Sequence, residues 1–186
     1  MRKVTVTIIL LTSQAILALA KPAKTAKERQ LVEAVHDGNM KVLERLLDSG
    51  INSDILDNRK DTPLMIAAKD NSVKVVKLLL NNGADINIKN KNTGKTSLMY
   101  ACMYGHDTIV KLLIGKKVIH GAKDYQGKTA LMYAVAFSRT NTVKYLIKQK
   151  VNVNKRSKSG ESALSIALKA GNVEIVEQLK AAGAKQ

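Results

Sequence analysis

The sequence of 186 residues has few of the residues on which small enzymes and disulfide-linked domains depend. Its one cysteine, Cys102, cannot form an internal disulfide, and it cannot provide a thiolate zinc site by itself. Three histidines leave little material for a metal centre. Tryptophan is absent, and six Phe and Tyr residues are too few for an aromatic-lined ligand pocket or a base-stacking platform. A hydrophobic content of 45% nevertheless argues against wholesale disorder.

The motifs of common enzyme chemistry are also missing. No residues pair a nucleophile with a base in a recognisable arrangement. Two Gly-Lys-Thr segments, at 94–96 and 127–129, look like the end of a phosphate-binding loop. That loop needs a further glycine where this chain has Lys89 and Ala122, so both segments are better explained as turns. We therefore expect no enzyme activity, no cofactor and no metal.

The first twenty residues have the pattern of a secretory signal peptide. Arg2 and Lys3 precede a mostly apolar stretch, which ends in Ala18-Leu19-Ala20. The alternatives are a buried N-terminal helix and an uncleaved anchor, although the polar interruptions do not suit a membrane-spanning helix. We expect cleavage after Ala20 and export of residues 21–186 to a periplasm or to the outside of the cell.

The rest of the chain repeats one pattern five times. Leucines recur at spacings of 33, 34, 33 and 33 residues, and alanines recur with the same spacings three residues further along. The two columns are Leu31, Leu64, Leu98, Leu131 and Leu164, and Ala34, Ala67, Ala101, Ala134 and Ala167. A fixed period of this length is typical of repeat architectures, in which each unit is one supersecondary motif.

Each unit has the punctuation of two short helices. In the second unit, Thr62-Pro63 provides an N-cap and a proline suited to the first helical position. A second helix is expected from Val73 to Leu80, and Asn82-Gly83 ends it because glycine readily adopts a left-handed conformation. An extended link then leads into the next unit.

This pattern resembles the ankyrin repeat. The segments Thr62-Pro63-Leu64, Gly105-His106 and 81–87 are among the clearest matches to the family pattern, and the resemblance covers about residues 26–186. It implies an all-α ankyrin-repeat solenoid of about five helix-turn-helix repeats with β-hairpin-like links. We number the expected repeats one to five, and their approximate ranges are 26–57, 58–91, 92–124, 125–157 and 158–186.

The chain departs from the family pattern at two columns. The motif histidine is replaced by Met65, Met99, Met132 and Ser165, and this change is expected to exchange a side-chain hydrogen bond for packing. Lys117 and Lys150 stand where other units have a glycine after the second helix. A lysine held at positive φ costs about 1 kcal/mol, so distorted turns are expected there.

Positive charge is concentrated in the middle of the chain. Residues 21–85 carry 11 basic and 10 acidic side chains, whereas residues 86–160 carry 15 basic and two acidic ones. One interpretation is a solvated, lysine-rich surface. The other is a field that steers an acidic partner toward repeats three and four.

The resemblance implies a partner site along the inner ends of the first helices and the hairpin tips. Met103, Tyr104, Tyr125 and Phe137 would form an apolar strip there, and such anchors are common at binding surfaces. The alternative is that Tyr104 and Phe137 pack over neighbouring units. The predicted polar members of the site are Arg59, Lys69, Asp70, Lys95, Lys128, Arg156 and Lys158. Tyr100, Tyr133 and Tyr145 fall in apolar columns and are expected in the core.

The predicted function is therefore an exported, non-enzymatic and monomeric module that binds an acidic or mixed-surface protein. Two alternatives remain open at this point. One is an electrostatic binder of an anionic envelope polymer or lipid, and the other is a secreted effector directed at a host. The export signal and the absence of a base-reading motif argue against nucleic acid as the partner.

Overall fold

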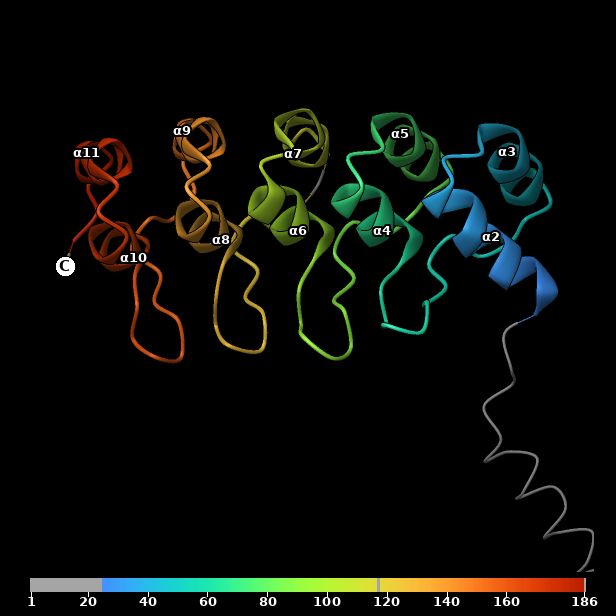
Figure 1. Cartoon of the computed structure of the whole chain (residues 1–186), viewed down its shortest axis with the longest axis horizontal. Coiled ribbons are helices and arrows are strands. Elements are labelled where there is room, and N and C mark those ends of the chain that lie inside the picture. Colours follow the sequence, from blue (N-terminus) through green and yellow to red (C-terminus); the bar gives the residue numbers. More distant parts are fainter. Residues whose placement is uncertain (1–24, 117, 186) are drawn as a thin grey trace, which may run out of the picture.

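The computed structural model describes residues 25–116 and 118–185, and the predicted signal peptide at 1–20 lies outside the described residues. Among these described residues, ten α-helices follow one another in five pairs (Figure 1). The pairs are α2 (Ala26–His36) with α3 (Met40–Asp48), α4 (Pro63–Lys69) with α5 (Val73–Asn81), α6 (Ser97–Tyr104) with α7 (Asp107–Ile114), α8 (Ala130–Ala136) with α9 (Thr140–Lys148), and α10 (Ala163–Lys169) with α11 (Val173–Ala181). The predicted all-α solenoid is confirmed.

The first helix of each repeat begins at a hydroxyl N-cap. The Oγ1 atoms of Thr62, Thr96 and Thr129 accept hydrogen bonds from backbone N–H groups three residues later, at 3.3–3.4 Å. Ser162 has the same role before α10. These bonds satisfy N–H groups that have no partner within the helix, and they set where the first helix of each repeat starts.

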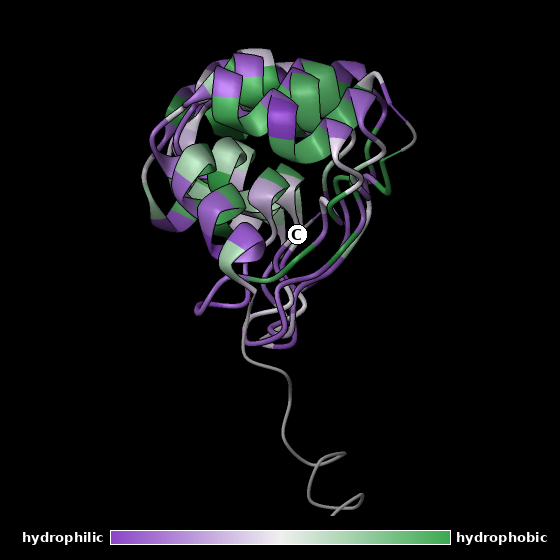
Figure 2. Ribbon diagram, turned by 90° about the vertical axis from the view of Figure 1, so that its right-hand side faces the viewer, coloured by the Kyte–Doolittle hydropathy of each residue, from purple (hydrophilic) through white to green (hydrophobic). Residues whose placement is uncertain are grey.

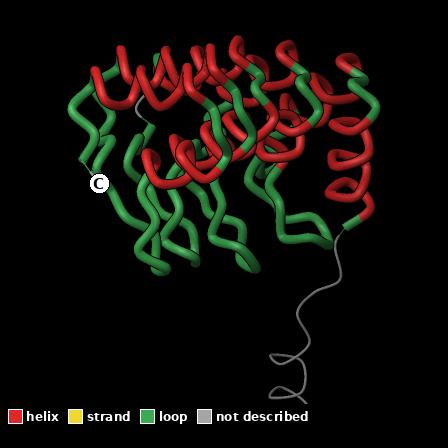
Figure 3. Tube along the Cα trace, turned by 60° about the vertical axis from the view of Figure 1, so that its left-hand side comes forward, coloured by secondary structure: helices red, strands yellow, loops and turns green. Residues whose placement is uncertain are grey.

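The helices form two layers, and the hairpins extend from one side (Figures 1 and 2). The layer of α2, α4, α6, α8 and α10, which we call the inner helices, lies next to the hairpins, and the remaining helices form the outer layer. The hairpins appear as loops in Figure 3. Within the described residues the one bridge of β type joins Arg156 and Ser162, so the links resemble hairpins without forming strands.

Each hairpin is closed by a backbone hydrogen bond across its base. We number the hairpins at 57–61, 90–95, 124–128 and 157–161 one to four. In the first, third and fourth, the N–H groups of Asp57, Asp124 and Ser157 donate to carbonyls four residues later, whereas in the second Asn90 donates to Lys95, five residues later. The extra residue that gives the single spacing of 34 is therefore absorbed in the second hairpin, and the helix pairs on both sides keep their stacking.

The two repeated columns form the core between the layers. The leucines of the first column are 0–3% exposed, and the alanines three residues later are 0–4% exposed. Small alanines allow the inner helices of neighbouring repeats to approach closely. The core is continuous from repeat one to repeat five, as expected for an array in which each unit is stabilised by its neighbours.

The replaced motif histidine has two outcomes. Met99 and Met132 are buried and fill the core, as the sequence predicts. The expected loss of a side-chain hydrogen bond is wrong for repeats two and five. The N–H of Thr62 lies 3.5 Å from the Sδ of Met65, and the N–H of Ser162 donates to the Oγ of Ser165 at 2.8 Å. The sulfur and the hydroxyl group thus replace the missing imidazole as acceptors.

The positive φ expected after the second helix is found at one of its two positions, but the turn there is not distorted, because it keeps the backbone hydrogen bonds of the glycine turns. Lys150 has a φ of +55°, while Lys117 lies outside the described residues. Lys60, at a hairpin tip, also has a positive φ, in a position where the later hairpins have Gly127 and Gly160. Residues in the left-handed conformation therefore occur at the hairpin tips as well as after the helices.

Helices of a length and hydropathy suited to crossing a bilayer do not occur among residues 25–116 and 118–185.

Candidate binding groove

The inner helices and the hairpins together form the surface that the sequence assigns to partner binding. Three of the four predicted apolar anchors are exposed on it: Tyr104 at 44%, Tyr125 at 51% and Phe137 at 47%. The fourth is a correction. Met103 is 9% exposed, and its side chain belongs to the hydrophobic core. Met103 cannot act as an anchor for a partner.

The exposed aromatic residues come from two different places. Tyr104 ends α6 and Phe137 caps α8, so both lie at the carboxyl ends of adjacent inner helices. Tyr125 lies in the third hairpin, where its ring is so near Gly94 that a methyl group at residue 94 would meet it at 2.6 Å. We call Tyr104 and Phe137 the aromatic pair, and Tyr125 belongs to the hairpin tips.

The ring of Tyr104 is held in place by a stacking contact with a neighbouring side chain. It stacks on the imidazole of His106, with ring centroids 5.8 Å apart. The Nε2 atom of His106 lies 3.0 Å from the carbonyl oxygen of Lys69, in the preceding repeat. Rigid, supported aromatic rings lose little conformational entropy on binding, so this arrangement suits an anchor.

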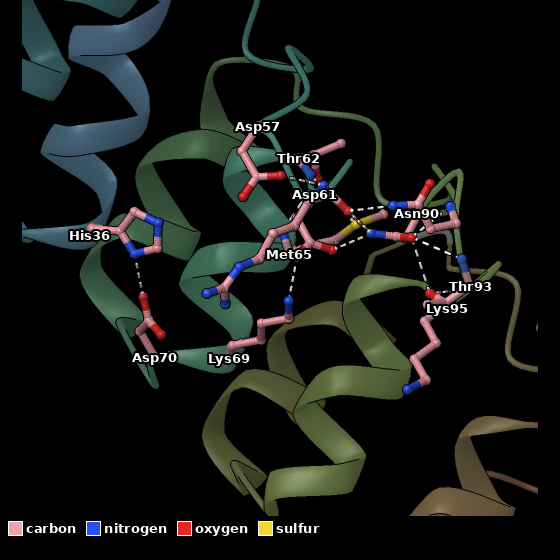
Figure 4. Close-up of polar contacts among 12 residues, drawn as sticks. His36, Asp57, Asp61, Thr62, Met65, Lys69, Asp70, Asn90, Thr93 and Lys95 are labelled. Carbon is pink, nitrogen blue, oxygen red and sulfur yellow. Dashed lines mark hydrogen bonds and ion pairs between the residues drawn. The ribbon is translucent and has the colours of Figure 1, made fainter.

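In repeat two the groove wall is held by a buried carboxylate (Figure 4). Asp61 is 2% exposed, and one of its oxygens accepts a hydrogen bond from Asn90 Nδ2 at 2.6 Å. Its other oxygen pairs with the Nζ of Lys69, which also lies 4.2 Å from the centroid of the Tyr100 ring. Lys69, a predicted site residue, therefore has a structural partner on each side.

Repeats three and four carry the opposite charge at the same column. Lys95 and Lys128 stand where repeats two and five have Asp61 and Glu161. The Nζ of Lys95 lies 5.7 Å from the centroid of the Tyr100 ring and 5.1 Å from that of Tyr133. Cation–π contacts of this kind hold an ammonium group without neutralising it. Neither lysine has an ion pair among the described residues.

Tyr133 is fixed by an acceptor in the third hairpin. Its hydroxyl donates to Asp124 Oδ2 at 2.6 Å, and Asp124 Oδ1 accepts the N–H groups of Gln126 and Lys128. The expected core positions of Tyr100 and Tyr133 are confirmed, since each is 6% exposed, and Tyr145 is half-buried against the core.

The other predicted polar residues are spread along the array. Asp70 Oδ2 lies 3.4 Å from His36 Nδ1, and Arg59 is exposed at the second repeat's hairpin tip. Arg156 donates to the carbonyl of Gly160 at 2.8 Å, while the side chain of Lys158 is exposed. The structure thus brings Arg59, Lys69 and Asp70 together at one end, and the set does not form one continuous site.

Some of the basic residues have a structural role that the sequence did not reveal. The Nζ of Lys89 donates to the carbonyl of Lys123, and the Nζ of Lys123 donates to that of Arg156, each at 2.7 Å. Lys155 likewise donates to Gly121 at 2.7 Å. These bonds tie successive links together, so part of the positive charge of the middle repeats belongs to the scaffold.

A hollow of about 650 Å³ opens between α2, α4 and the hairpin at 57–61. Arg59, Lys69 and Asp70 line it, together with Glu33, His36 and Asp57. Sequence reasoning missed it. One feature of the sequence could have indicated the hollow. Repeat two has Ile66 in the column where repeats three and four have tyrosines, and the smaller side chain leaves more open space between α2, α4 and the hairpin at 57–61.

Burial of the tyrosines predicts a pH effect. Burial raises the pKa of Tyr100 and of Tyr133, and the hydrogen bond to Asp124 raises the pKa of Tyr133 further. A pKa raised in the folded state favours folding below the ordinary tyrosine value near 10, and this contribution falls as the pH rises above it. We expect Tyr100 and Tyr133 to ionise only as the chain unfolds in alkali, as followed by tyrosinate absorbance and circular dichroism. Tyr133→Phe should remove one late-titrating group, and early ionisation of every tyrosine would contradict the assignment.

The comparisons with known proteins agree with this geometry. A family model described as "Ankyrin repeats (3 copies)" matches residues 31–124 and residues 115–186. No curated protein matches the chain.

Over the part of the chain that the structure describes, no group of three His, Cys, Asp or Glu residues could hold a metal ion.

Proposed function

Because the chain belongs to the ankyrin repeat family, whose members generally mediate protein–protein interactions, we propose that its groove binds an acidic segment of a protein partner. Proteins of this family are typically non-enzymatic binding modules. The partner would contact the aromatic pair on α6 and α8, and the hairpins of repeats three and four would provide the charge.

One observation carries this proposal. The aromatic pair is exposed at the carboxyl ends of α6 and α8, and Tyr104 stacks on His106. In the hairpins before these two helices, Lys95 and Lys128 replace the acidic residues of repeats two and five, and they have no ion pair among the described residues. Apolar anchors and unpaired charges of one sign in the same repeats favour a partner that has both an apolar patch and carboxylates.

The setting of this interaction is proposed from the N-terminal sequence. Arg2 and Lys3, the apolar stretch and the Ala18-Leu19-Ala20 ending support export of the chain through a secretory route. We propose that the partner is met in a periplasm or outside the cell, and that the binding module is a monomer.

The test is a pull-down from an extract of the cells that express this chain, followed by affinity measurements on the retained protein. Tyr104→Ala with Phe137→Ala should weaken binding at least about tenfold, because a truncated anchor typically costs more than about 1 kcal/mol each. The matched control is Leu168→Ala with Val173→Ala. These residues are 43% and 68% exposed in the last repeat, outside the aromatic pair, and their loss should leave the affinity unchanged.

Retained affinity in the aromatic double variant would overturn the groove as the binding site.

The contribution of the lysines to binding has its own test. Lys95→Asp with Lys128→Glu places the residues of repeats two and five in the middle repeats, and it should weaken binding and reduce its dependence on salt.

A second candidate function is binding to an anionic polymer or lipid surface. The row of cations at Lys89, Lys123 and Arg156, which occupies one position in successive repeats, favours it. Binding of this kind falls steeply with salt through counterion release. If the retained material is diffuse and is lost at high salt, and if the aromatic double variant binds it equally well, this second function replaces the first.

A further inference from the structure

The hollow between α2 and α4 differs from the rest of the groove in its charge. It lies at the end of the array farthest from the basic middle repeats, and its lining includes the carboxylates of Glu33, Asp57, Asp61 and Asp70. Asp61 is committed to Lys69 and Asn90. The other three carboxylates have no permanent cation as a partner among the described residues.

Asp57 is the most informative of these groups, because it is 8% exposed and its carboxylate is only half satisfied. Its Oδ1 accepts the N–H of Asp61 at 2.7 Å, while its Oδ2 has no partner in the described part of the chain. At the same position of the third hairpin, Asp124 uses its Oδ2 to accept the hydroxyl of Tyr133. Repeat two has Ile66 in the tyrosine column and cannot supply that donor.

Asp57 lines the hollow, and its second carboxylate oxygen offers an acceptor there to a donor, for which a cationic group is the best match. A charge-assisted hydrogen bond is stronger than a neutral one, and the low local exposure of Asp57 limits screening by water. Val32 and Ile66 line the same hollow and offer apolar contact to an aliphatic stem. Arg29 and Arg59 are also at this site, but both are exposed, so their charges are screened more effectively.

We propose that this hollow is a subsite for an arginine or lysine side chain of the protein bound in the groove. The inference rests on the proposed function and adds a direction to it. The bound segment presents a basic residue to repeats one and two and acidic residues to repeats three and four. The opposite charges at the two ends would then fix the orientation in which the partner lies.

The test uses a small cation and does not need the partner. L-argininamide is titrated into the purified chain at low salt, and amide chemical shifts are followed by NMR. L-citrullinamide, which replaces the guanidinium with a neutral urea, is the matched probe. We expect saturable shifts at 57–61 and along α2 and α4 with L-argininamide, and at least about fivefold weaker binding of L-citrullinamide.

Asp57→Asn should weaken L-argininamide binding by about tenfold, because it removes the charge and keeps the shape. Asparagine already occupies this position in the second hairpin, where Asn90 Oδ1 accepts two backbone N–H groups, so the variant should fold. The control is Glu177→Gln, an equal change of charge on exposed α11.

Equal binding of the two probes, or unchanged binding by Asp57→Asn, would overturn the subsite. Tighter binding of succinate than of L-argininamide in the same titration would also overturn it, because the hollow would then bind an anion through Arg29 and Arg59. These outcomes leave the groove itself untouched, since the aromatic double variant tests that surface separately.

Discussion

Gly127→Ala is expected to destabilise the chain by about 3 kcal/mol in urea unfolding followed by circular dichroism. Gly127 has a φ of +77°, which costs an alanine about 1 kcal/mol. A methyl group there would also lie 2.7 Å from the backbone nitrogen of Lys158, in the next hairpin. That nitrogen donates to Gln126 at 2.8 Å, so relief of the clash would break a hydrogen bond between repeats.

Gly160→Ala is the matched control for this prediction. Gly160 takes the same place in the last hairpin with a φ of +79°, but a methyl group there meets nothing within 4 Å. It should therefore cost only the conformational term of about 1 kcal/mol. Equal losses in the two variants would show that close contact between hairpins does not contribute. Because repeat arrays can lose end units separately, a separate early transition of repeat five in Gly127→Ala would support the argument.

Asp61→Ala should cost about 3 kcal/mol in the same unfolding measurement. Asp61 is 2% exposed and links Lys69 of its own repeat to Asn90 of the next hairpin. Removing one partner from a buried pair leaves the other without compensation, which is the expensive case. Lys69 would lose its carboxylate while it remains over the ring of Tyr100, and the Nδ2 of Asn90 would keep only the carbonyl of Arg59.

Glu161→Ala removes the same ion pair in repeat five and is the control. Glu161 pairs with Lys169 at 2.7 Å, but the Lys169 side chain is 70% exposed. The hydrogen bond from Lys169 lowers the pKa of Glu161, although water screens this surface pair. We expect little change in stability from Glu161→Ala. A loss as large as that of Asp61→Ala would contradict the role assigned to burial.

The repeat columns illustrate how far prediction from sequence could go. Columns spaced by about 33 residues predicted the helix pairs, because apolar side chains of the stacked units must meet at equivalent positions. Positive φ at Lys150 could be predicted for the same reason, since three of the five residues in its column are glycines. The placement of Tyr100 and Tyr133 in the core followed from Ile66 in their column.

The candidate groove was only partly predictable. Tyr104 and Phe137 were correctly expected at the surface, whereas Met103, one residue before Tyr104, turned out to be buried. Neighbouring residues at a helix end point to different sides, and the angle at which the next repeat packs decides which of them is covered. The half-satisfied carboxylate of Asp57 could not be predicted from the sequence either, because whether its second oxygen has a donor is decided by the side chain that approaches from the adjacent element.

By itself, the sequence determined the repeat period, the helix starts and stops, the family resemblance and the concentration of positive charge at 86–160. These features depend on local spacing and on residue type. Only the tertiary structure decided which charges are compensated by an ion pair, as in Lys69 with Asp61, and which have no ion pair among the described residues, as in Lys95 and Lys128. The reason is physical: a hydrogen bond or ion pair between repeats joins residues about 30 positions apart, and its formation depends on how the units stack.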